Sequence, residues 1–101
     1  MSTLEIKVRN KDGQKVAYEC GFVPVSKYRE YLEMASRHEN KEKPLAEFEK
    51  LDEQLIFIAS LFPGLSSDEM YQGLEMAELN DIISKVFIKL IGGEADPKGS
   101  A

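Results

Sequence analysis

The sequence is poor in the residues that most catalytic and metal sites use. Its 101 residues include one cysteine, Cys20, one histidine, His38, and no tryptophan. A lone cysteine excludes an internal disulfide and is typical of a reducing compartment. A structural zinc site needs four Cys or His ligands, and the chain holds two such residues in total. We therefore expect no metal site.

The same shortage argues against catalysis. A nucleophilic site needs a nucleophile, a base and a group that orients the base. Cys20 falls on a strand position expected to be buried, and His38 falls in a polar helix end, where a solvated surface residue is expected. The seven glycines form neither a P-loop nor a dinucleotide-binding pattern, so no phosphate-bearing cofactor is predicted. The sequence predicts a protein that is not an enzyme and has no cofactor.

Long apolar runs and targeting signals are also missing. The longest apolar run, residues 55–59, has five residues, whereas a membrane-spanning helix needs about 20. The first residues contain no basic segment followed by an apolar core, so no secretory signal is predicted. We expect a cytoplasmic protein without a membrane partner.

Negative charge dominates, but unevenly. Residues 1–43 hold nine Lys or Arg against seven Asp or Glu, and residues 44–101 hold four against eleven, giving +2 and −7 for a total of −5. Phosphate backbones would repel the acidic half, and an excess of two cations is far below a nucleic-acid footprint. We expect no nucleic-acid partner.

What the chain does contain is a pattern for one small globular domain. Apolar residues alternate with polar ones around Ile6 and again around Tyr18, and Asp12-Gly13 lies between the two runs. Two period-2 runs around such a turn predict a β-hairpin over residues 3–20 with one buried face. Leu4, Ile6, Val8, Val16 and Tyr18 should form that face, with Lys7 and Arg9 in solvent. An isolated hairpin is marginal in water, so it must pack on something.

Helical spacing dominates the rest of the chain. Four helices are predicted at residues 26–39, 44–62, 66–74 and 76–91. Ser26 should cap the first helix, Pro44 should lie in the first turn of the second, Ser66 with Glu69 should form a capping box, and Gly92 should end the last helix. The prediction is an α+β fold, predominantly helical, with the hairpin packed on three longer helices and one short one. It forms a single domain over residues 1–92, followed by a flexible tail at 93–101.

Three apolar residues are left over when the helical stripes are assigned. Phe57 and Leu61 point away from the main stripe of the 44–62 helix, whose members include Phe48 and Leu55, and Ile88 points away from the stripe of its own helix. They form either an exposed patch for a partner or for self-association, or a second buried side of a central helix. We predict Phe57, Leu61 and Ile88 as partner-binding residues, with both interpretations open.

Several segments resemble a known family. They are residues 57–62 with the Pro63-Gly64 break that follows, Met70, Gly73-Leu74, residues 91–93, and the hairpin leading into residues 22–25 and 27–29. Over about residues 4–93 the chain resembles the tail assembly chaperones of long-tailed, siphovirus-type phages and prophages of Gram-positive bacteria. The resemblance implies a non-enzymatic protein of the host cytoplasm that binds the tape measure protein and keeps it soluble while tail tube subunits polymerise. It also implies that the chaperone is not retained in the mature virion.

In this family a ribosomal frameshift near the end of the gene often yields an extended form, which is thought to engage the tail tube protein. Asp96-Pro97-Lys98 can be encoded by a slippery sequence, although the same tripeptide is also an ordinary polar terminus. Two other functions stay open. One is a small helical regulator or antitoxin-like inhibitor of one cellular protein, and the other is a structural tail component.

Overall fold

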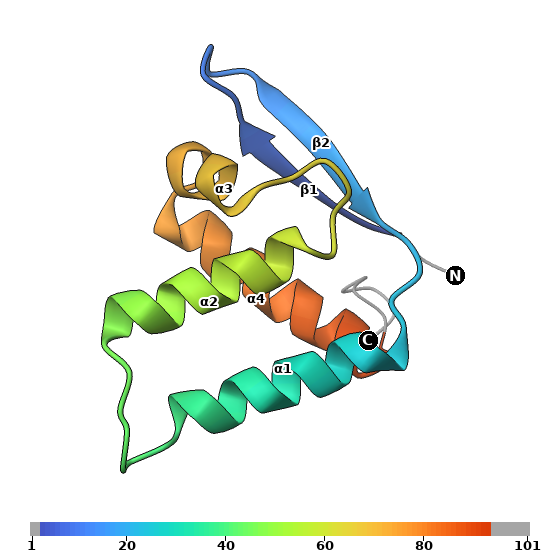
Figure 1. The fold of residues 1–101 in the computed structure, drawn as a ribbon. Helices are drawn as coiled ribbons and strands as arrows, with labels where there is room; N and C mark the ends of the chain where they lie inside the picture. Colours follow the sequence, from blue (N-terminus) through green and yellow to red (C-terminus); the bar gives the residue numbers. More distant parts are fainter. Residues whose placement is uncertain (1–2, 94–101) are drawn as a thin grey trace.

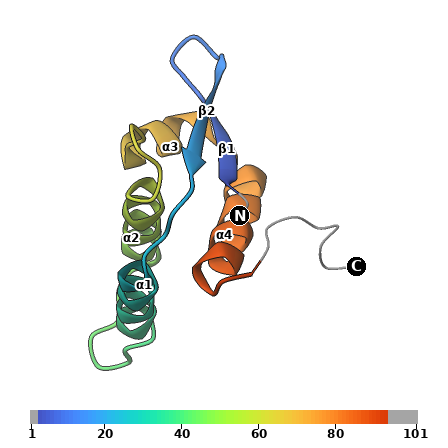
Figure 2. The same cartoon turned by 90° about the vertical axis from the view of Figure 1, so that its right-hand side faces the viewer.

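The computed structural model describes residues 3–93 of the chain as a hairpin followed by four helices. The elements are β1 (Leu4–Arg9), β2 (Lys15–Cys20), α1 (Val25–His38), α2 (Glu47–Ala59), α3 (Ser67–Gly73) and α4 (Met76–Leu90). Helices α1 and α2 lie antiparallel in one layer, α4 crosses behind them, and the hairpin extends beyond α3 (Figures 1 and 2). The predicted fold class, a predominantly helical α+β fold with an N-terminal hairpin, is confirmed.

The hairpin forms where the alternation and the turn residues predict it. The two strands pair antiparallel, with Ile6 opposite Tyr18. The amide of Gly13 donates to the carbonyl of Asn10 at 3.0 Å, and Gly13 has a φ of +82°. Such a φ is accessible to glycine without steric cost, which suits it to close this loop.

One face of the hairpin is buried, mainly through β1. Leu4, Ile6 and Val8 are at most 5% exposed. Helices α3 and α4 contact β1, so β1 is the strand nearer to the helices and β2 is the outer strand. Consequently Tyr18 is half-buried and Val16 is 36% exposed. The prediction that Val16 belongs to the packed face was wrong.

Helix α1 starts one residue before its predicted start. Pro24 is the N-cap, with an extended backbone (φ −69°, ψ 156°), and its carbonyl accepts a hydrogen bond from the amide of Lys27 at 2.9 Å. Ser26 therefore lies inside the first turn, and the prediction that it caps the helix was wrong.

Helix α2 is shorter at both ends than predicted. The side chain of Asn40 accepts hydrogen bonds from the amides of Glu42 and Lys43, which holds the preceding loop in a turn and leaves Pro44 outside the helix. Ala46 is the N-cap, and its amide donates to the carboxylate of Glu49 at 2.9 Å. Since alanine has no side-chain acceptor, only half of a capping box is present.

The chain after Ala59 tightens into a turn. The amide of Leu61 donates to the carbonyl of Ile58, and that of Phe62 to Ala59, which is the three-residue spacing of a 3₁₀ turn. Pro63 disfavours helical backbone at the residue before it. The predicted break at Pro63-Gly64 is present, and Gly64 has a φ of +86°.

The predicted caps of the last two helices are confirmed. The Glu69 amide donates to the Ser66 hydroxyl at 3.2 Å, and the Ser66 amide donates to the Glu69 carboxylate at 2.9 Å. At the end of α4, Gly92 has a φ of +86°, and the Gly93 amide donates to the Ile88 carbonyl at 2.8 Å. This pairing is a Schellman motif, so Gly93 belongs to the helix end. The remainder of the predicted tail, 94–101, lies outside the described residues.

The core joins the hairpin to all four helices. Its most deeply buried side chains are Phe62, Leu55, Met70 and Val8. Val8 lies beside Gly73, the last residue of α3. A Cβ added at Gly73 would lie 2.2 Å from the Arg9 carbonyl oxygen and 2.6 Å from Val8 Cγ1. Only a residue without a side chain allows α3 to approach β1 this closely.

An ion pair closes the same junction. Arg9 Nη1 lies 2.8 Å from Glu78 Oε1, in the first turn of α4, so Arg9 is tied to a helix and is only partly in solvent, contrary to the prediction. The hydrogen bond from Arg9, together with one from the Glu75 amide, lowers the pKa of the Glu78 carboxyl. Charge and backbone therefore both favour ionised Glu78 at this position.

Replacing Gly73 with alanine should destabilise the protein. The added methyl group meets backbone atoms of Arg9, which cannot move aside cheaply, so we expect a loss of about 1–3 kcal/mol in the free energy of unfolding, as for other overpacked sites. Urea unfolding followed by circular dichroism measures it. Gly21→Ala is the matched control, because nothing lies within 4 Å of a Cβ there. Equal stability of the two variants would contradict the close approach.

The Arg9–Glu78 pair should make stability depend on pH. The folded pKa of Glu78 lies below its unfolded value. The pair therefore stabilises the protein above the unfolded pKa of about 4.3 and loses that effect as the pH falls through the folded pKa. Glu78→Gln should be less stable than the parent near neutral pH, and the difference should shrink in acid. Denaturant titrations across this range test it, with Glu42→Gln in the exposed loop as the charge control. A difference that stays constant with pH would contradict the pairing.

Candidate protein-binding groove

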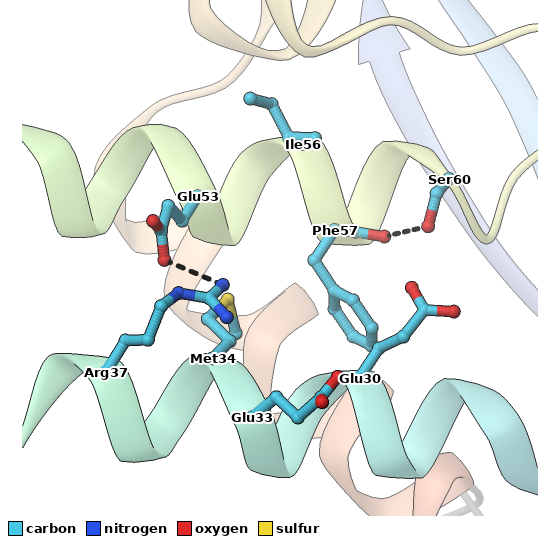
Figure 3. A pocket seen from close by; sticks show the side chains of 8 residues that line it. All are labelled: Glu30, Glu33, Met34, Arg37, Glu53, Ile56, Phe57 and Ser60. Atoms are coloured by element: carbon cyan, nitrogen blue, oxygen red, sulfur yellow. Dashed lines mark hydrogen bonds and ion pairs between the residues drawn. The ribbon is translucent and has the colours of Figure 1, made fainter.

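A groove of about 290 Å³ lies between α1 and α2, and in the view of Figure 3 α4 passes behind it. Its lining residues are Glu30, Glu33, Met34, Arg37, Glu53, Ile56, Phe57 and Ser60. Figure 3 shows the Phe57 ring projecting from α2 toward α1, while Ile56 projects away from α1 and borders the groove at its α2 edge. The volume is slightly below the roughly 300–1,000 Å³ of small-molecule pockets, and the site suits one or two protruding side chains.

The floor of the groove is apolar and connected to the core. Phe57 is 8% exposed and Met34 5%. The Phe57 ring lies 6.1 Å from that of Tyr31, which in turn lies 5.6 Å from the ring of Phe87 on α4. Tilted aromatic pairs at these distances stabilise packing beyond the area they bury. The three rings therefore fix the spacing of α1, α2 and α4.

A smaller cavity lies on the other side of this floor. It measures about 50 Å³ and is bounded by α1, α2 and α4. Met34 and Phe57 line both spaces and so form the partition between them. Methionine adapts easily to the shape of its neighbours, so a floor of this composition can accept apolar side chains of different shapes.

The rim of the groove is charged. Arg37 Nη2 lies 3.2 Å from Glu53 Oε1, and His38 Nε2 lies 3.0 Å from the same oxygen. Partial burial acts to raise the pKa of the Glu53 carboxyl, but the hydrogen bonds from Arg37 and His38 outweigh it and lower that pKa. The His38 side chain is 13% exposed, so the prediction that it is a solvated surface residue was wrong.

Two further carboxylates of α1 line the groove. Glu30 lies 3.5 Å from Lys27 Nζ, and Glu33 lies 3.1 Å from Arg29 Nη1. Both carboxylates are about half exposed, at 51% and 52%. Ion pairs of this kind contribute little because water screens them, so a partner's cation can replace the present one at small cost.

The residues predicted as a partner-binding patch do not form one exposed surface. Leu61 is 9% exposed, within the turn after α2, and Phe57 is the groove floor, so the exposed-patch interpretation was wrong for both. Ile88 is half-buried on α4. The reason is that α2 is covered by α1 on one side and by α3 on another. A binding role for these residues stays a prediction.

The exposed apolar residue at the groove is Ile56, at 60%. Ile56 was not predicted as a binding residue, because on the helix surface it lies between the main stripe and Phe57. Phe48 was assigned to the buried stripe but is 69% exposed. Helix α2 begins at Glu47, so Phe48 is in its first turn and lies beyond the elements that cover the rest of the helix.

The described residues offer no alternative centre of chemistry. Cys20 is 3% exposed, and burial raises the pKa of its thiol, which opposes nucleophilic use. Within residues 3–93, no three His, Cys, Asp or Glu side chains are grouped closely enough to hold a metal ion. No helix in this part of the chain has the length and apolar character needed to cross a membrane.

Comparison with known proteins decides the family. A family model described as phage tail chaperone protein matches residues 1–101. The chain belongs to this phage tail chaperone family. No curated protein and no solved structure matches it. Tail chaperones of this kind are generally non-enzymatic and act on protein partners in tail assembly. The α1–α2 groove is therefore the candidate protein-binding site of this chaperone.

Replacing both Phe57 and Leu61 with serine should unfold the chaperone. Both side chains are buried, and large-to-small core replacements each cost about 2–5 kcal/mol. Ile56→Ser is the matched control on the same helix, because an exposed residue usually changes stability by less than about 0.5 kcal/mol. Thermal melts followed by circular dichroism distinguish the variants. A double variant that melts like the parent would restore the exposed-patch interpretation.

Proposed function

We propose that this chaperone binds the tape measure protein of a long-tailed phage of Gram-positive bacteria. It keeps that protein soluble in the host cytoplasm while tail tube subunits polymerise around it, and it is absent from the finished virion. The proposal extends the family membership, which covers the whole chain.

One observation carries the proposal at the level of structure. The groove between α1 and α2 has a buried apolar floor and an exposed apolar edge, Ile56, on a face that no other described element covers. A partner helix docks in such a groove by placing apolar side chains in it while its polar face stays in water. If the tape measure protein is long, helical and carries exposed apolar residues, it would aggregate unless the chaperone covered those residues.

The regulator or antitoxin-like alternative and the structural-component alternative fit the groove equally well on geometry alone. Family membership favours the chaperone over both. A frameshift-extended form that contacts the tail tube protein would continue the chain near Asp96-Pro97-Lys98, which lies outside the described residues. Self-association stays a prediction, and it would use exposed apolar residues other than those of the groove.

Co-expression tests the proposal. The tape measure protein, expected in the long reading frame downstream, should be insoluble alone and should appear as a soluble complex with this chaperone. Ile56→Glu should reduce the soluble complex severalfold because it places a charge at the apolar edge of the groove. Phe22→Glu is the matched control, since Phe22 is 80% exposed in the linker before α1. No soluble complex with the parent chaperone, or an equal loss in both variants, would contradict the proposal.

A further inference from the structure

We propose that the α1–α2 groove selects a helical segment that carries a large apolar side chain between Lys or Arg residues. The apolar side chain would lie over Phe57 and Met34, and the basic residues would reach Glu30 and Glu33. This inference rests on the proposed function and names the kind of segment that the groove takes.

The shape of the site favours a helix. The groove lies between two antiparallel helices whose opposite face packs against α4 through Tyr31 and Phe87 (Figure 2). A partner helix on the open face would lie against α1 and α2, as α4 lies against them on the other face. Its apolar side chain would contact the two floor residues and the edge residue Ile56, as a knob enters the space between helices.

The charges favour a basic segment. Three carboxylates, from Glu30, Glu33 and Glu53, line the groove against one guanidinium, that of Arg37. Glu53 already accepts from Arg37 and His38 and is used within the protein. The side chains of Glu30 and Glu33 project from α1 into the opening (Figure 3). Glu33 pairs with the exposed Arg29, whereas Lys27, the partner of Glu30, is 24% exposed and also donates to Ser60 Oγ.

Charge also decides against an acidic partner and against a second copy of the chain. The groove lining carries three carboxylates against one guanidinium, and its α2 side belongs to a segment, residues 44–101, with a net charge of −7. Two copies facing each other across their grooves would bring these carboxylates together, and like charges at an interface repel each other. A basic helix gains attraction at the same positions.

The test uses two synthetic peptides as probes for the full-length chaperone. Both carry the same Leu and Phe stripe at helical spacing, and their polar faces carry lysine in one and glutamate in the other. Fluorescence anisotropy at low salt should give about tenfold tighter binding of the lysine peptide. The preference should fall at high salt, since salt screens exposed charges.

Two charge-reversal variants locate the effect. Glu30→Lys with Glu33→Lys should remove or reverse the preference. Glu5→Lys with Glu19→Lys, a cross-strand pair on the exposed hairpin face, should leave it unchanged. Each double variant adds four charges and takes the net charge from −5 to −1, so a general charge effect would change both equally. That result, or equal binding of the two peptides by the parent, would overturn the inference.

Ile56→Ala should weaken both peptides severalfold, and Val25→Ala, at an exposed apolar position elsewhere, should weaken neither. Sedimentation of the parent and of the Glu30→Lys, Glu33→Lys variant shows whether a second copy occupies the groove. If the parent is a dimer and these charge reversals break it, the inference is also overturned. Failure here is distinguishable from failure of the proposed function. A soluble tape measure complex without peptide discrimination would leave the proposed function intact, whereas no such complex would contradict it.

Discussion

The structure depends on the contact between β1 and the end of α3. A two-stranded hairpin cannot stand alone in water, so its apolar face has to be covered by helices. That cover requires the backbone of Gly73 to come next to Arg9 and Val8, closer than any side chain would permit. Because Arg9 also pairs with Glu78 at the start of α4, one short stretch of β1 fixes two helices at once. Covering the hairpin therefore also sets the positions of α3 and α4.

The arrangement of the remaining helices follows from this junction. Helix α2 leads into α3 through the Pro63-Gly64 turn, and α1 enters from β2, so the two run side by side with α4 behind them. Tyr31 lies between the rings of Phe57 and Phe87 and holds this spacing. A chain this short has only one modest core, and no element within residues 3–93 covers the outer face of the α1–α2 layer. The groove is the result of that shortage of covering elements.

Charge has two separate uses in this protein. The pairs of Arg9 with Glu78 and of Arg37 and His38 with Glu53 join elements that are distant in sequence, and they lower the pKa of their carboxyl groups. The pairs of Glu30 and Glu33 lie within one exposed helix. Carboxylates of the first kind join distant elements of the fold, whereas those of the second kind are paired only within α1.

The sequence by itself determined the local structure of this chaperone. Alternation and Gly13 predicted the hairpin, and Ser66 with Glu69 and Gly92 predicted helix ends, because each of these signals acts within a few residues. The scarcity of cysteine and histidine, a property of the composition, argued against catalysis. Only the tertiary structure decided which apolar residues are covered. Phe57 and Leu61 are buried, Val16 and Phe48 are exposed, and Ile56 borders a groove. Burial depends on which distant element lies over a helix face, and the helical spacing of apolar residues does not indicate which element that is.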